Sequence, residues 1–123
     1  MDIWFLTAGV AAAAVALTHF FLGGREIARP TPTAGEMHSV VRHTNYYCWH
    51  LVTLSLVLMA AGFFYTALPA RPQEPAAAAT LFAAAAAFRC LGINLRFNLK
   101  HAHHPQWMLF LPVAVIGAAG LFQ

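Results

Sequence analysis

The chain has 123 residues, of which 60% are hydrophobic and only 9% are charged. Soluble domains carry about 25% charged residues, so this composition excludes a water-exposed globular protein. The formal net charge is +3, but the basic residues are scattered along the chain, which argues against nucleic-acid binding. The composition predicts a single-domain integral membrane protein, and its unusual feature is the seven histidines, as many as all Lys and Arg together.

Two apolar runs in the first half predict membrane-spanning helices. The first covers residues 3–22, and we expect the Gly23-Gly24-Arg25 sequence that follows to end the helix. The second is predicted over about 40–68, with a charge-free part from Tyr46 onward. A connector with three prolines, residues 69–75, predicts a tight turn after it. Each run is long enough to cross a hydrocarbon layer of about 30 Å as a helix.

The second half predicts two further spans. The third covers about 76–99, but its charge-free part ends at Phe88, so the helix must carry Arg89 into the membrane. Its alanine runs, 76–79 and 83–87, offer the small side chains that allow helices to pack closely in lipid. The fourth covers about 106–122, contains Pro112, and is the shortest of the four.

The distribution of basic residues predicts the orientation. Six of the seven Lys and Arg lie near the helix ends within residues 23–45 and 89–106, and only Arg71 lies on the other side. Cytoplasmic loops of membrane proteins are enriched in basic residues. The sequence therefore predicts an all-α, antiparallel four-helix transmembrane bundle in the cell inner membrane, with both termini outside the cytoplasm. Its expected partner is the lipid bilayer, including anionic lipid.

All seven histidines fall at the predicted cytoplasmic end. His19 and His50 lie about one turn inside the apolar boundary on adjacent antiparallel spans, so we expect them to face each other. Imidazole is the commonest metal ligand near neutral pH, and converging helix ends would bring several imidazoles together. The candidate metal ligands are His19, His43, His50, His101, His103 and His104.

Three site chemistries fit these residues. In the first, His19 and His50 are the axial ligands of a haem held between helices. In the second, His38, His43 and the 101–104 segment bind a metal ion, with Glu26 or Glu36 as an oxygen ligand. In the third, the thiols of Cys48 and Cys90 bind copper. We expect these residues to form a polar pocket at the cytoplasmic end. The remaining candidates for binding a cofactor there are Tyr46, Arg89, Asn94 and Arg96.

Arg42-His43-Thr44-Asn45 stands at the start of the second span, and Arg89 lies in the third. With four spans, an outside N-terminus and a cytoplasmic loop, this outline resembles the small membrane glutathione transferases. In that family a Glu follows the Asn by three positions, whereas Cys48 stands here. The resemblance implies an enzyme in which Arg42, Asn45, Arg89 and Arg96 bind an anionic thiol cofactor.

The functional prediction is a small inner-membrane protein with a polar pocket, rich in His, Arg and Asn, that binds a metal ion or haem. Two alternatives stand beside it. One is an accessory or scaffold subunit of a membrane complex or homo-oligomer, and the other is the glutathione-transferase-like enzyme. No phosphate-binding loop or serine-hydrolase motif occurs in the sequence, so neither chemistry is expected.

Overall fold

The computed structural model describes all 123 residues and contains helices and no strands. Its four long helices are α1 (Ile3–Thr18), α2 (Ser39–Thr66), α3 (Glu74–Arg96) and α4 (Gln106–Leu121). The prediction of an all-α chain with four main helices is therefore confirmed. The last three helices begin and end within about three residues of the predicted runs, because prolines and polar turns interrupt the apolar pattern there.

The first helix differs from its prediction at its end. It does not stop at Gly23-Gly24 but continues as the π-helix η1 (His19–Ala28), and after Arg29 and Pro30 the short 3-10 helix η2 (Thr31–Thr33) follows. Gly23 has a packing role instead of a terminating one, since a Cβ there would overlap the indole of Trp49 on α2. π-helices are rare, usually a single turn, and often occur at functional sites.

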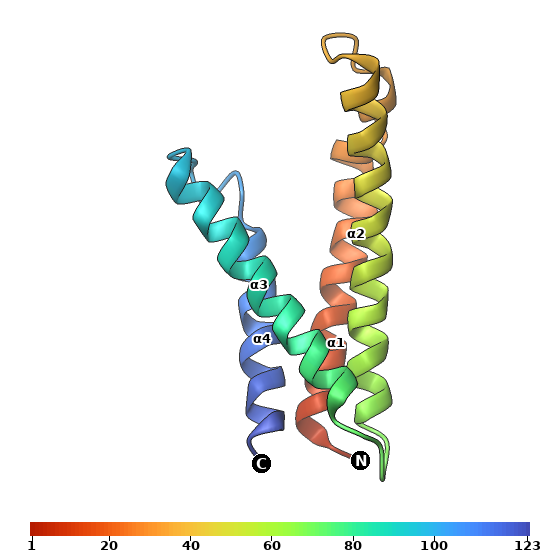
Figure 1. The fold of residues 1–123 in the computed structure, drawn as a ribbon, viewed down its shortest axis with the longest axis vertical. Coiled ribbons are helices and arrows are strands. Elements are labelled where there is room, and N and C mark those ends of the chain that lie inside the picture. The colour runs from red at the N-terminus through yellow and green to blue at the C-terminus, as the bar shows by residue number, and fades with distance from the viewer.

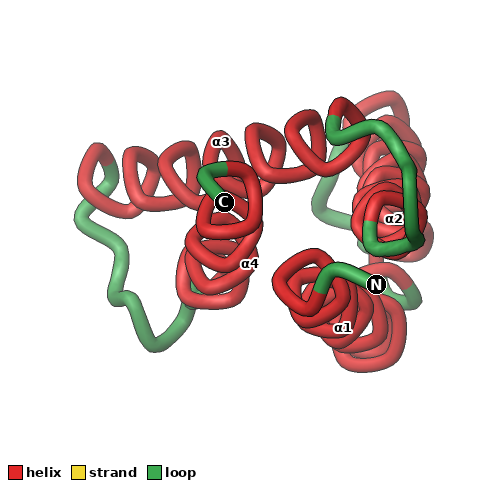
Figure 2. The backbone as a smooth tube through the Cα atoms, turned by 90° about the horizontal axis from the view of Figure 1, so that it is seen from below, coloured by secondary structure: helices red, strands yellow, loops and turns green.

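The helices form two arms that meet at one end of the molecule (Figure 1). In one arm, α1 and η1 run beside α2; in the other, α3 and α4 lie together and lean away from the first arm. Both chain termini lie at the closed end, where α1 also packs against α4 (Figures 1 and 2). The opposite ends of the arms, which carry the connecting segments 29–38 and 97–105, stand apart (Figure 1).

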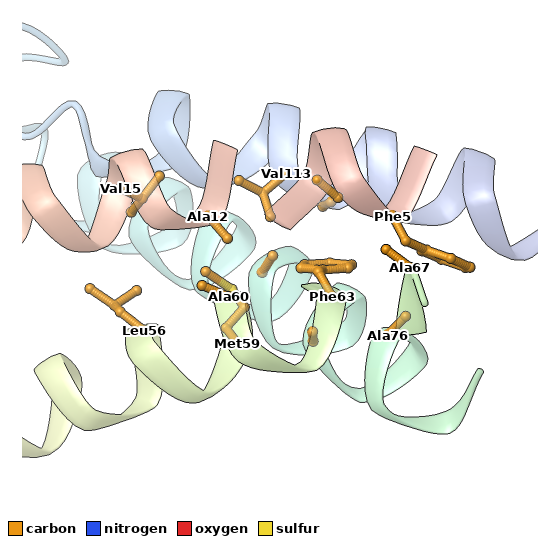
Figure 3. Packing of buried hydrophobic residues seen from close by; sticks show 14 residues of the cluster. Phe5, Ala12, Val15, Leu56, Met59, Ala60, Phe63, Ala67, Ala76 and Val113 are labelled. Carbon is orange, nitrogen blue, oxygen red and sulfur yellow. The ribbon is translucent and has the colours of Figure 1, made fainter. Parts of the chain in front are cut away.

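A cluster of 14 buried residues holds the closed end together, and eight of these are alanines (Figure 3). Ala76, Ala79 and Ala83 form one buried face of α3, which confirms the prediction that the alanine runs pack closely. Gly117 on α4 is buried against Thr80 and the Phe63 ring. Small residues let the backbones approach, and this is how helices associate where water supplies no driving force.

Three helical stretches are long and apolar enough to cross a membrane: Ile3–Thr33, Ser39–Thr66 and Glu74–Arg96. The fourth, Gln106–Leu121, is apolar but shorter, with 16 residues. Large apolar side chains face outward along the helices, among them Leu58, Leu81 and Phe88, each at least 70% exposed. The outer surface along the helices therefore carries many large apolar side chains, in contrast to the surface of a soluble bundle.

Candidate functional site

A cleft with a volume of about 780 Å³ lies between the two arms. One wall comes from α1, η1 and α2, and the other from the loop before α4 and the first turns of α4. Its lining residues are Val15, Thr18, His19, Leu22, Gly23, Glu26, Ile27, Thr31, Met37, Asn45, Cys48, Trp49, Val52, Leu56, His103, Pro105, Gln106, Leu109 and Phe110. Titratable side chains, among them His19, Glu26 and His103, line this cleft. A second hollow, of about 370 Å³ between α2 and α3, has no titratable side chain on its lining.

The polarity of the cleft changes along its length. Its base is formed by Val15 and Leu56, which belong to the buried core cluster. Its mouth carries exposed polar side chains, including Glu26, Asn45 and His103. No Lys or Arg lines the cleft, and Glu26 is its only carboxylate. The cleft is thus apolar at one end and polar at the other.

His19 lies on the wall of the cleft, half-buried, at the point where α1 becomes η1. Its ring stacks on Trp49, with ring centroids 3.8 Å apart and planes inclined by 14°. Its Nε2 lies 3.2 Å from the hydroxyl of Thr53, one helical turn beyond Trp49 on α2. Two contacts from one face of α2 therefore fix the position of this imidazole.

His50 does not join His19 in the cleft. Trp49 and Thr53 occupy the place beside His19 that we predicted for His50, while His50 is exposed and its ring packs edge-on against Tyr46, at a centroid distance of 4.6 Å. The reason is the helical period of about 100° per residue, which turns residue 50 away from the face that residues 49 and 53 share. The structure therefore gives no support to a haem held by this pair.

The other histidines are spread over several local structures. His38 caps the N-terminus of α2, His43 bonds the Ser39 carbonyl oxygen within its own helix, and His103 lines the cleft. His101 and His104 lie in the turn before α4 and are exposed. No three His, Cys, Asp or Glu side chains are grouped to hold a metal ion. The predicted metal site does not appear, because most of these residues sit on separate helix ends and turns.

Asn94 has a structural position next to the cleft. It is 2% exposed, and its Nδ2 donates a 3.0 Å hydrogen bond to the carbonyl oxygen of His104. The same Nδ2 lies 3.4 Å from Nδ1 of His101, whose ring contacts the indole of Trp107 edge-on. Asn94 therefore ties the end of α3 to the loop that supplies His103 to the cleft.

The arginines that we predicted for an anion pocket lie apart from the cleft lining. Arg89 and Arg96 are exposed on α3, and Arg96 lies over the ring of Phe97. Arg42 is half-buried and donates to the carbonyl oxygen of Ala34, which anchors the loop before α2. Of the four residues implied by the glutathione-transferase resemblance, only Asn45 reaches the cleft.

The two cysteines are free thiols in different surroundings. Cys48 lines the cleft and is exposed. Cys90 lies on α3, with its Sγ 3.6 Å from Oε1 of Gln106. Gln106 lines the cleft and Cys90 does not, so Cys90 contacts a lining residue from outside the cleft.

Sequence reasoning missed the partners of His19. Neither Trp49 nor Thr53 is among the site residues predicted from the sequence. The spacing of 49 and 53 was a usable signal, since residues four apart lie on one helix face. Comparisons with protein-family models, curated proteins and solved structures give no match to this chain.

Proposed function

We propose that this is a small protein of the cell inner membrane that binds an amphipathic small molecule in the cleft between its two arms. The observation that carries the proposal is the polarity of the cleft, with a buried apolar base and an exposed polar mouth. Binding sites for small molecules are concave and largely apolar, with a few placed polar groups. An apolar chain would fill the base and a polar headgroup would lie beside His19 and the mouth.

Embedding in a membrane is supported by helix length and by the apolar exterior. At 1.5 Å per residue, the 28 residues of α2 extend about 42 Å and the 16 residues of α4 about 24 Å, against a hydrocarbon layer of about 30 Å. Both termini lie at one end of the molecule, as an even number of crossings requires (Figure 1). We therefore propose four crossings, of which α4 is the shortest.

The proposed orientation puts the mouth of the cleft on the cytoplasmic side, because six of the seven Lys and Arg belong to the ends of the arms. Among them, Arg89 and Arg96 are exposed beside outward-facing Phe88 and Leu95. Long basic side chains in such surroundings extend their charge toward the headgroup layer. We propose that they contact anionic lipid there.

Fluorescence quenching by a brominated amphiphile tests cleft binding. The probe is 11-bromo-1-undecanol, added to the protein in lipid nanodiscs. In the variant Trp4→Phe/Trp107→Phe, Trp49 on the cleft wall is the sole tryptophan. Quenching of Trp49 should saturate at a low mole fraction of the probe in the lipid, because a binding site is being filled.

The matched control is Trp49→Phe/Trp107→Phe, which keeps only Trp4 near the opposite end of α1. Quenching of Trp4 should rise linearly with the probe, since it reports the probe dissolved in the bilayer. Equal, unsaturated quenching of Trp49 and Trp4 would contradict the proposed function. The orientation has its own test: with Cys48 and Cys90 replaced by Ser, an impermeant thiol reagent applied to intact cells should label Gln123→Cys and not Lys100→Cys.

A further inference from the structure

The hydrogen bonds around His19 determine which of its nitrogens carries the proton in the neutral ring. Thr53 Oγ1 lies 3.1 Å from the carbonyl oxygen of Trp49 and 3.2 Å from Nε2 of His19. A carbonyl oxygen only accepts, so the single hydroxyl proton of Thr53 is donated to Trp49. Thr53 can then only accept at its other contact, and Nε2 of His19 must be the donor.

This assignment leaves Nδ1 of His19 as a hydrogen-bond acceptor. In a neutral imidazole one nitrogen is a donor and the other carries a lone pair, so an Nε2–H ring has its lone pair on Nδ1. No side chain or backbone group of the protein bonds Nδ1, and it is not among the buried side-chain atoms without a partner. Nδ1 is therefore accessible at the surface of the protein, on a ring that lines the cleft.

We infer that the cleft selects an amphiphile whose headgroup donates a hydrogen bond and carries no negative charge. This inference rests on the proposed function and adds the class of ligand. His19 Nδ1 would accept from a headgroup hydroxyl or amine, and the ring is held for this by Thr53 and by its stacking on Trp49. The lining has no Lys or Arg to bind an acidic headgroup, and the carboxylate of Glu26 would repel one.

The test compares three probes with the same 11-bromoundecyl chain: the alcohol, its methyl ether and the sulfonate. The alcohol can donate a hydrogen bond, the ether is neutral and only accepts, and the sulfonate is an anion that only accepts. All three are titrated into nanodiscs against the variant whose only tryptophan is Trp49, with the Trp4 variant correcting for their different partition into lipid. One neutral hydrogen bond predicts that the alcohol binds roughly threefold to tenfold more tightly than the ether, and the sulfonate more weakly still.

Three variants connect the selectivity to His19. His19→Phe keeps an aromatic ring against Trp49 but removes Nδ1, so the preference for the alcohol over the ether should vanish. Thr53→Val keeps the side-chain shape but frees the imidazole, so the preference should fall without loss of binding. Thr7→Val is the matched control: Thr7 lies outside the cleft lining, and its hydroxyl donates to Ile3 in its own helix, so the preference should stay.

The outcomes separate this inference from the proposed function. Saturable binding of all three probes with equal affinity would overturn the inference and leave the proposed function standing. Tighter binding of the sulfonate would do the same. An alcohol preference that survives both His19→Phe and Thr53→Val would also overturn it, because the acceptor would then be another group. Absence of saturable quenching by every probe would overturn both proposals.

Discussion

The imidazole of His19 lies flat on the indole of Trp49, with their centroids 3.8 Å apart, and both residues line the cleft. The far edge of the same indole lies against Gly23, one helical turn beyond His19, where a side chain would overlap it. Two residues of the first helix thus fix one tryptophan of the second. The glycine provides the space and the histidine provides the stacking surface.

Replacing Gly23 by Ala should displace Trp49. The added methyl group would overlap the ring, and overpacking of this kind costs about 1–3 kcal/mol in a well-packed site. We expect a lower midpoint of thermal unfolding in mild detergent and weaker saturable quenching of Trp49 by the brominated alcohol. The measurement is a thermal scan together with the quenching titration.

Gly24→Ala is the control for this change. It lies in the same π-helix, but a Cβ there has nothing within 4 Å. Because Ala favours helix over Gly by up to about 1 kcal/mol, this variant should be as stable as the parent or more stable. Equal destabilisation by both variants would mean that the π-helix itself, and not contact with Trp49, tolerates no side chain.

Packing at the closed end should depend on Gly117. A Cβ there would overlap the hydroxyl of Thr80 on α3 and the ring of Phe63 on α2, both of which are buried. We expect Gly117→Val to lower the free energy of unfolding by about 3 kcal/mol or to prevent folding, since the larger side chain would displace α4 away from α2 and α3. Gly92→Ala on α3, where a Cβ meets nothing, should be as stable as the parent or more stable in the same thermal scan.

Much of this fold could be predicted from the sequence, because long apolar runs bounded by proline and polar turns have few alternatives to helix. The end of the first helix could not. A glycine pair reads as a helix end, but Gly23 is held in helical backbone by its contact with Trp49, which is tertiary information. Glycine at a close approach and glycine at a helix end look identical in one sequence.

The site was predicted less well, for a reason of geometry. Span depth correctly brings His19 near the residues around position 50, but depth does not determine which face of α2 is turned inward. That face carries Trp49 and Thr53. The next residue along the helix, His50, is turned by about 100° from Trp49 and is exposed. The divergence of the arms, which opens the cleft, depends on where the small residues pack, and it leaves no periodic signal of its own.

Asn94 should control the order of the loop before α4. Asn94→Leu removes the amide donor to the carbonyl oxygen of His104 and leaves that oxygen with only the 3.9 Å contact to the Cys90 thiol, at a cost of about 1–3 kcal/mol. A variant whose only tryptophan is Trp107 reports this locally, since its indole contacts the His101 ring beside Asn94. We expect red-shifted emission and a lower unfolding midpoint. Asn45→Leu, an exposed position, should leave the emission of Trp107 unchanged; a shift there as well would point to a general loosening.

The turn between α2 and α3 offers a stabilising substitution. Ala70 has a φ of 57°, the left-handed region that costs an ordinary residue about 1–2 kcal/mol and costs glycine little. We therefore expect Ala70→Gly to raise the thermal midpoint, as relief of this conformation outweighs the greater flexibility of glycine in the unfolded chain. The matched change is Ala78→Gly on the exposed side of α3, where the helical backbone does not need the conformational freedom of glycine. This variant should lower the free energy of unfolding by about 1 kcal/mol. A raised thermal midpoint for Ala70→Gly together with a lowered one for Ala78→Gly would verify the backbone conformation of this turn. A lowered midpoint for both variants would refute it.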